Sequence, residues 1–564
     1  MAHFHIKYKN GRPYLYVREI ARVGGKPKVI SQIYIGAPDR VKELVNKDTE
    51  EVKLRVEEFG SVWLANEIDR GIDLAGIIDS VIPRDRKEKG PSIGEYFAYT
   101  IINRMIDPHS KHSLADWFKN TAIKEIRPVD LNDLSSERFW EKWNRVSEKD
   151  LADVAKKFFN RIRSIEKVDP DCFLFDTTNY YTYMASDTPS ELAKRGNNKD
   201  SKHHLRQIGL AMLVGRGDMM PLYYHVYPGN LHDSKEFAAV IEDMIGVMQE
   251  EDGIKKRLTI VVDKGMNSED NFLLIDRHRQ IHFITSYSTH YSEELTNISL
   301  EKFTPIKLNE EDDCEPIRAY QTTGEYWGGK RTVVVTYNPR TAGKQSIAFE
   351  GKLDTLRKEL LLIRSKVNAG KAQWKNEETI FERYIKICNG LHIPSTVYEL
   401  SFEKSRNGLK MSFRQNVYWL NKHMAAFGKS IIITDNEDWA IEEIVRANID
   451  RWQIEQQFRQ SKDEDHVSTM PLRHWTDGQI RCHLFTCVVA TTYIKLLERL
   501  LRKSNIKMTG AAAIEEMKNL HSVLAIRKTK PVRRLEEPTK TQMMILNAMG
   551  YEINNSWVLQ KING

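Results

Sequence analysis

Short apolar runs recur between residues 166 and 289, separated by turns and amphipathic segments, and this rhythm constrains the fold more than any other feature. The runs have the length and composition of buried strands, and two intervening segments have the apolar spacing of helices. Their order predicts an α/β domain built on a mixed sheet covered by helices. The strand candidates are 172–175, 208–214, 222–227, 258–262 and 282–287, and the helix candidates are 234–248 and 268–278.

The same rhythm resumes after residue 425, so the α/β domain is predicted to be discontinuous. Residues 430–434 are a further strand candidate, and one helix is expected from about Trp439 to Lys462. A chain of 564 residues is also too long for a single core, at ~150 residues per domain. The expected division is 1–50, β-hairpins; 51–165, a helical region; 166–289 with 426–500, the α/β domain; 290–425, a β-rich insertion; and 501–564, a helical C-terminal region.

Three of these regions leave alternatives open. The hairpins of 1–50 are predicted from the turn dipeptides Asn10-Gly11 and Gly24-Gly25. The short helices of 51–165, rich in Lys, Arg and Trp, suit either a DNA-binding module or a plain helical packing domain. The basic C-terminal segment 527–534 suits a contact with DNA or with a partner subunit, or a solvated linker.

Composition excludes some classes of protein and leaves others open. The polar N-terminal segment and the lack of any apolar run near ~18 residues argue against a signal peptide and a membrane span. Five scattered cysteines without a C-x-x-C pair argue against a disulfide framework, and we expect a cytoplasmic protein. The net charge of +7 permits an acidic partner such as DNA without demonstrating one.

Two acidic residues directly follow buried strand candidates. Asp176 ends the run 172–175, and Asp263 ends the run 258–262. A strand end is rigid and emerges at the edge of the sheet, where solvent and a metal ion can reach a carboxylate. The alternative for each residue is an aspartate that caps a turn.

A third acidic residue lies among basic ones in the expected helix 439–462. Arg451, Glu455, Arg459 and Lys462 are spaced i, i+4, i+8 and i+11, which at ~100° per residue places them on one helix face. Three cations around one carboxylate make a surface for phosphates, with the glutamate free to bind a metal ion. The alternative is a solvated face carrying weak i, i+4 ion pairs.

These motifs resemble those of DDE transposases of prokaryotic cut-and-paste insertion sequences. Arg451, Glu455 and Lys462 match the Arg-x3-Glu-x6-Lys part of the Tyr-x2-Arg-x3-Glu-x6-Lys signature, while Asn448 stands at the tyrosine position. The similarity covers about residues 165–500, with a β-rich insertion before the glutamate. Further matching segments are Phe175-Asp176-Thr-Thr, Val262-Asp263-Lys-Gly265, Pro228-Gly-Asn-Leu-His-Asp233 and the Arg-Trp-x-Ile-Glu-x-x-Phe pattern that includes Trp452.

The resemblance implies an RNase H-like fold in which Asp176, Asp263 and Glu455 hold two Mg²⁺ or Mn²⁺ ions. Two such ions activate the attacking water and stabilise the leaving 3′-oxygen in DNA cleavage. The implied reaction is cleavage at the ends of a mobile element followed by joining of the 3′ ends to target DNA. The implied partners are double-stranded DNA and, once assembled on DNA, a second copy of the chain, in the cytoplasm at the nucleoid. The alternatives are a metal-dependent nuclease without strand transfer and a domesticated, DNA-binding derivative of a transposase.

Further DNA contacts are expected outside the triad. Asn448, Trp452 and Arg459 accompany Arg451 and Lys462 on the helix, and Lys199, Lys202 and Arg206 lie in a basic, glycine-containing loop. Trp327, Trp374 and Trp419 are candidates to stack on a flipped base, with core packing as the alternative. The spacing of His203, His204, His225 and His232 matches no familiar zinc site.

Overall fold

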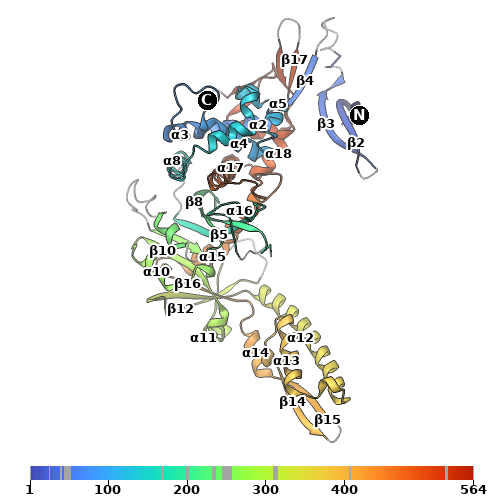
Figure 1. Ribbon diagram of the computed structural model, residues 1–564, viewed down its shortest axis with the longest axis vertical. Coiled ribbons are helices and arrows are strands. Elements are labelled where there is room, and N and C mark those ends of the chain that lie inside the picture. The colour runs from blue at the N-terminus through green and yellow to red at the C-terminus, as the bar shows by residue number, and fades with distance from the viewer. Residues whose placement is uncertain are drawn as a thin grey trace.

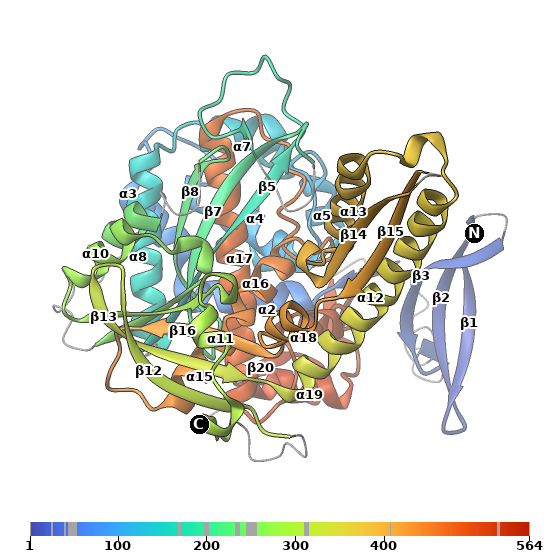
Figure 2. The same ribbon diagram turned by 90° about the horizontal axis from the view of Figure 1, so that it is seen from below.

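The computed structural model shows an elongated molecule with a large sheet near its middle (Figure 1). A helical region lies above that sheet, a helical insertion projects below it, and a small N-terminal sheet stands to one side (Figures 1 and 2). The structure describes all residues except 1, 24–25, 39–40, 43–52, 167–170, 197–201, 232–236, 244–256, 309–314, 406–407, 527–530 and 563–564.

The large sheet confirms the predicted mixed α/β architecture. It has ten strands, ordered β11-β12-β13-β16-β10-β9-β5-β7-β6, with β8 also paired to β7. Strands β5, β9 and β10 run parallel, whereas β7, β8, β16, β13 and β12 pair in antiparallel fashion with their neighbours. The strands are β5 (Cys172–Thr182), β6 (Lys194–Arg195), β7 (Arg206–Gly215), β8 (Pro221–Pro228), β9 (Leu258–Val262), β10 (Ile281–Tyr287), β11 (Thr304–Pro305), β12 (Arg318–Tyr326), β13 (Gly329–Tyr337) and β16 (Lys429–Thr434).

The central strands are apolar because both faces of the sheet are covered. All five residues of β9 are buried, and β7 is buried from its second residue onward; unbroken apolar runs are typical of strands covered on both faces. α16 packs on β5, α17 and α8 pack on β8, and α10 and α15 pack on β10. These helices are α8 (Glu148–Glu166), α10 (Glu269–Asp276), α15 (Ile441–Asp450), α16 (Trp452–Ser461) and α17 (Asp477–Lys503), and residues 237–243 are also helical.

The helical region that precedes the sheet shares one hydrophobic core with it. α4 begins at a capping box between Ser92 and Glu95 and ends at Ile106, before Pro108, as its sequence predicts. It is buried almost throughout and packs on α17. The other elements here are β4 (Lys53–Glu58), α2 (Gly60–Ile72), α3 (Leu74–Val81), α4 (Ile93–Ile106), α5 (Leu114–Asn120), α6 (Ile123–Ile126), η1 (Leu131–Leu134) and α7 (Ser136–Trp143).

The N-terminal hairpins are present and extend into a three-stranded sheet. It comprises β1 (Ala2–Lys9), β2 (Arg12–Val23) and β3 (Lys26–Gly36). Asn10 and Gly11 both have positive φ, 52° and 74°, as a two-residue turn of type I′ requires. The second expected turn, Gly24-Gly25, lies outside the described residues.

The insertion differs from the β-rich domain that the sequence predicts. β12 and β13 belong to the large sheet, and the described chain between β13 and β16 is mainly helical, with one two-stranded sheet. α12 is a long helix whose buried residues, from Ala342 through Leu356 to Val367, recur at helical spacing among many charged ones. The insertion has its own core. Its elements are α12 (Pro339–Asn368), η5 (Ala372–Trp374), α13 (Glu377–Leu391), η6 (Ser395–Val397), β14 (Tyr398–Ser405), β15 (Gly408–Gln415) and α14 (Val417–Met424).

The sequence predicts a helical C-terminal region, but the structure has both helices and strands there. This region also packs back against the N-terminal half of the chain. β17 pairs with both β18 and β4, so this sheet joins residues more than 450 positions apart. The elements are α18 (Gly510–Lys518), β17 (His521–Ile526), β18 (Val532–Leu535), α19 (Lys540–Ala548), β19 (Tyr551–Ile553) and β20 (Leu559–Lys561). Within the described residues, none of the helices combines the length and the apolar character that crossing a membrane demands.

Candidate active site

The two predicted aspartates lie at neighbouring positions of the large sheet. Asp263 directly follows β9, as predicted, whereas Asp176 lies inside β5, which continues past it to Thr182 because it stays paired with β7. β5 and β9 are parallel, with Phe173 opposite Ile260 and Leu174 opposite Val261. Continuing this register places Asp176 opposite Asp263, on strands that lie ~4.8 Å apart. Both residues are only partly buried, so both carboxylates remain accessible at the point where β9 ends.

Asp263 is held in its charged form by a cation and a backbone amide. Burial alone would raise the pKa of its carboxyl, but the Arg451 guanidinium and the N–H group of Lys264 together lower the pKa below its usual value. Arg451 Nη1 forms an ion pair with Asp263 Oδ1. Asp176 Oδ1 accepts a hydrogen bond from the Thr177 N–H group at 2.8 Å.

Glu455 lies on α16, the helix that packs against β5. Its side chain is exposed. The end of α16 is tied to the strand that carries Asp176, because the hydroxyls of Tyr180 and Ser461 are 2.7 Å apart. Lys462 Nζ lies 5.5 Å from the centre of the Tyr180 ring. The glutamate therefore stands on a helix that is anchored to the aspartate-bearing strand.

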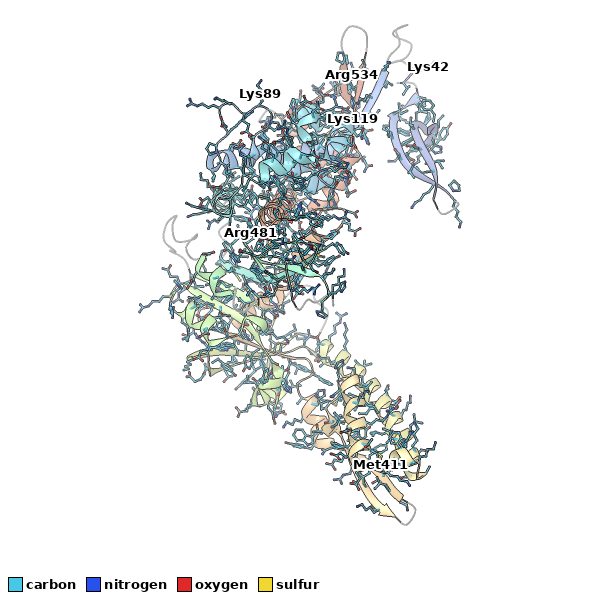
Figure 3. The ribbon with its side chains drawn as sticks, viewed as in Figure 1. Lys42, Lys89, Lys119, Met411, Arg481 and Arg534 are labelled. Carbon is cyan, nitrogen blue, oxygen red and sulfur yellow. The ribbon has the colours of Figure 1, made fainter. Side chains whose placement is uncertain are left out.

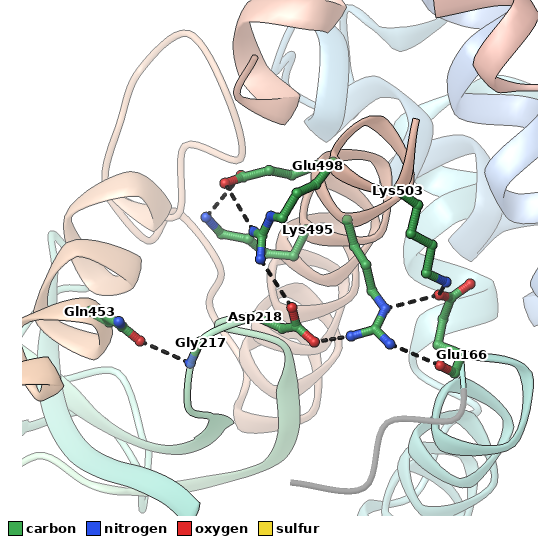
Figure 4. Close-up of polar contacts among 9 residues, drawn as sticks. Glu166, Gly217, Asp218, Gln453, Lys495, Glu498 and Lys503 are labelled. Carbon is green, nitrogen blue, oxygen red and sulfur yellow. Dashed lines mark hydrogen bonds and ion pairs between the residues drawn. The ribbon is translucent and has the colours of Figure 1, made fainter. Parts of the chain in front are cut away.

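The beginning of α16 is fixed by the turn between β7 and β8 (Figure 4). The Gly217 N–H group donates to Gln453 Oε1 at 3.1 Å, and Arg216 Nε donates to Asp450 at 2.7 Å. Asp218 in the same turn pairs with Arg499 and Arg502 of α17. The part that this turn plays in positioning the Glu455 helix depends on contacts between residues far apart in the chain.

The expected single helix 439–462 is instead two helices that meet at Arg451. α15 ends at Asp450, and α16 begins at Trp452. Arg451 keeps helical backbone angles (φ −54°, ψ −27°), and tertiary ion pairs of Asp450 and Arg451 flank the break. Arg451 thus points to Asp263 and does not share one continuous helix face with Glu455.

The other expected DNA contacts on these helices differ in accessibility. Arg459 is exposed, and Trp452 is 52% exposed. Asn448 Oδ1 accepts a hydrogen bond from Ser286 at 2.9 Å, which gives the residue at the signature's tyrosine position a link to β10. Arg459 and Trp452 are therefore the more accessible candidates for contact with a ligand.

The basic loop before β7 is less available than its composition suggests. Arg206 donates to the carbonyls of Ala193, Ala185 and Thr188, so its guanidinium serves to hold the preceding chain. Lys202 Nζ lies 3.8 Å from the centre of the Tyr181 ring. Lys199 and His232 lie outside the described residues.

The tryptophan candidates lie in three different settings. Trp327, at the β12–β13 turn, packs on Phe272 with ring centres 4.3 Å apart, which favours the core-packing alternative. Lys366 Nζ lies 5.6 Å and Arg383 Cζ 5.8 Å from the centre of the Trp374 ring. Trp419 is 38% exposed, and its ring lies 4.3 Å from Lys422 Nζ. Of the three, Trp419 is the best placed to stack on a base.

In the described part of the chain, no three His, Cys, Asp or Glu side chains are grouped closely enough to hold a metal ion. The three carboxylates are expected to converge either in the folded structure or once DNA and metal bind; the described residues do not meet the first alternative, and the second remains a prediction. The two aspartates are already neighbours by register, and the side chain of Glu455 is exposed.

Comparison with known proteins identifies the family. The family model described as a transposase DDE domain matches residues 169–489, more than half of the chain. The chain therefore belongs to the family of proteins with a transposase DDE domain. The matched segment contains Asp176, Asp263 and Glu455.

Other comparisons add little. No curated protein matches the sequence. Among solved structures, a piggyBac transposase synaptic complex with hairpin DNA is similar over 83% of this chain and 82% of that chain, with 8% sequence identity and a TM-score of 0.37. A likeness at that TM-score has no bearing on the fold or the function of this chain.

Proposed function

We propose that this protein is a transposase that binds the ends of a mobile DNA element, cleaves the DNA and joins the 3′ ends to target DNA. One observation carries the proposal: the strand register sets Asp176 beside Asp263, and the Glu455 helix is tied to the same strand, inside the matched domain. An RNase H-like fold is part of the proposal and is supported by the mixed sheet with helices packed on it.

The donor set suits Mg²⁺ or Mn²⁺. Asp176, Asp263 and Glu455 offer only carboxylate oxygens, which hard divalent cations prefer, and the two aspartates stand on rigid strands. Two ions held there would supply an activated water and charge stabilisation at the leaving oxygen. Within the chain, β5 and β9 fix two ligands, and the contacts at both ends of α16 orient the helix that brings the third.

The charge distribution supports DNA as the partner. Residues 1–36 contain seven Lys and Arg against one Asp or Glu, and residues 338–428 contain sixteen against eight. The net charge of the whole chain is only +7, so the remainder is net negative. We infer that the N-terminal sheet and the insertion bind phosphates on either side of the acidic site, with a second copy of the chain joining on DNA.

An excision assay tests the proposal. The substrate is a supercoiled plasmid that carries this gene with its flanking DNA, and joining is scored on a labelled target duplex. Asp176→Asn, Asp263→Asn and Glu455→Gln should each lower excision by about 10³-fold or more, because each removes a group that acts in the transition state. DNA binding measured without divalent metal should be retained.

Two matched variants serve as controls. Asp171→Asn changes an exposed aspartate beside the start of β5, and Glu464→Gln changes an exposed glutamate just after α16; both should excise normally. Normal excision by any of the three triad variants would refute the proposed site. Cleavage without joining would instead indicate a nuclease.

A further inference from the structure

Arg451 forms an ion pair with Asp263, whose carboxylate is a metal ligand in the proposed chemistry. In this structure the Nη1 atom of Arg451 is ion-paired with Asp263 Oδ1. The side chain of Arg451 is 22% exposed and that of Asp263 is 37% exposed, so the pair lies at the surface of the site. An ion pair that is partly exposed can exchange partners with a ligand from solution.

The pair opposes metal binding in two ways. It uses one oxygen of Asp263 that a metal ion would otherwise coordinate. It also places a guanidinium, which stays protonated in proteins, next to the position of a divalent cation, and like charges repel at short range. An ion near Asp176, the neighbour by register, would still lie close to the cation on Asp263.

A DNA phosphate offers Arg451 an alternative partner. The planar guanidinium can bind a phosphate through two parallel hydrogen bonds, as it binds a carboxylate. Arg451 contacts Asp263, and both side chains are partly exposed. A phosphate that reaches this carboxylate would therefore also reach the guanidinium.

We propose that Arg451 blocks the metal site until DNA binds. Without DNA, Arg451 pairs with Asp263; a bound phosphate becomes its new partner, and the Asp263 carboxylate can then bind metal. We call this arrangement the lock. This inference rests on the proposed function. It makes Arg451 a positioning residue whose loss has opposite effects on two measurements. Metal binding by the free protein should improve, whereas cleavage should decline because the phosphate contact is lost.

The coupling must be reciprocal. If DNA raises the affinity for metal by a given factor, metal raises the affinity for DNA by the same factor. Such couplings typically span ~5–150-fold. Replacing Arg451 with glutamine should abolish most of this coupling, because the side chain that exchanges partners is gone.

The experiment is a titration of the full-length protein with Mn²⁺. Electron paramagnetic resonance measures the concentration of free Mn²⁺ at each step. The titration is done without DNA on wild type, Arg451→Gln, Asp263→Asn and Arg473→Gln. Arg473 is an exposed arginine outside the site and serves as the matched control. We expect Arg451→Gln to bind Mn²⁺ at least ~5-fold more tightly than wild type, Asp263→Asn to bind it more weakly, and Arg473→Gln to match wild type.

The outcomes separate the lock from the proposed function. If Asp263→Asn weakens Mn²⁺ binding but Arg451→Gln leaves it at the wild-type value, the lock is refuted and the metal site stands. If neither change affects Mn²⁺ binding, the lock is refuted together with the role of Asp263 as a ligand. Circular dichroism melts of each variant show whether it is folded, and Arg451→Lys, which keeps the charge, should retain the weak Mn²⁺ binding of wild type.

Discussion

At the level of single residues, ionic contacts between distant segments hold the parts of the chain that surround the site. Arg451 joins the start of α16 to the end of β9, and Arg216 joins the β7–β8 turn to α15. Farther away, His521 Nδ1 lies 2.8 Å from Glu536 in the sheet that closes the C-terminal region onto β4. Each pair is only partly exposed, so salt screens each less than it would a fully solvated ion pair.

The His521–Glu536 pair makes stability depend on pH. Burial alone would lower the pKa of His521, but its contact with Glu536 raises the pKa above the usual value. A raised pKa means stabilisation that is fully present below pH ~6.5 and is lost as pH rises through the pKa of the folded state. His521→Gln should therefore cost about 1.5 kcal/mol of unfolding free energy at pH 5.5, and much less at pH 9.

Urea unfolding at the two pH values measures this difference. His112→Gln, at an exposed histidine, is the matched control and should behave as wild type at both. An equal loss of stability at pH 5.5 and pH 9 would contradict the assignment.

At the level of elements, the site depends on how α16 is held against β5. The Ser461 hydroxyl donates to the Phe458 carbonyl at 2.8 Å, so the Tyr180 hydroxyl is the donor in the 2.7 Å contact with Ser461. This bond is buried and links the strand of Asp176 to the helix of Glu455. The helix position is thus set by tertiary contacts at both of its ends.

Tyr180→Phe should loosen that link. Losing one buried hydrogen bond costs ~1 kcal/mol of unfolding free energy, and excision should fall several-fold while metal-free DNA binding stays unchanged. Tyr181→Phe, the next residue on the opposite face of β5, is the matched control. Excision rates and urea midpoints of both variants check the prediction, which fails if the two variants have the same excision rate.

At the level of the whole molecule, positive charge is concentrated in two protruding parts. The N-terminal sheet and the insertion project from the body (Figures 1 and 2), and Figure 3 shows Lys42, Lys119 and Arg534 at the same end as the N-terminal sheet. On one face of that sheet, Lys9 pairs with Arg12 across β1 and β2, and Lys7 lies over the ring of Tyr16. Basic and aromatic side chains together suit contact with nucleic acid.

Replacing Lys7, Lys9 and Arg12 with glutamine should weaken DNA binding and its dependence on salt. Each lost phosphate contact lowers the slope of log K against log salt by ~0.9, so a total decrease of up to ~2.7 is expected. Binding isotherms at several salt concentrations give the slope. The control replaces three exposed lysines of the helical region and C-terminal tail, Lys87, Lys149 and Lys507, and an equal change in slope for both sets would contradict the inference.

The sequence by itself determined six strands of the large sheet (β5, β7, β8, β9, β10 and β16), the N-terminal hairpin and the position of Asp263 at the end of β9, because these depend on local patterns of apolar residues and turns. Asp176, expected at a strand end, lies within β5, because that strand continues to Thr182 in its pairing with β7. The sequence also indicated the family through short motifs around Asp176, Asp263 and Glu455. These features need no knowledge of distant contacts, since strand propensity and turn geometry are local.

Only the tertiary structure decided the rest. The break at Arg451, the β7–β8 turn that holds α16 and the return of β17 to β4 all rest on contacts between residues far apart in the chain. The insertion is more helical than the sequence suggests, because the charged helix expected at 351–366 extends over Pro339–Asn368 and the strand expected at 332–337 joins the large sheet as β13. Arg206 looks like a phosphate ligand in the sequence, yet it holds three backbone carbonyls in the fold. The partner of a side chain depends on which residues the fold brings near it, and the order of residues along the chain does not specify these contacts.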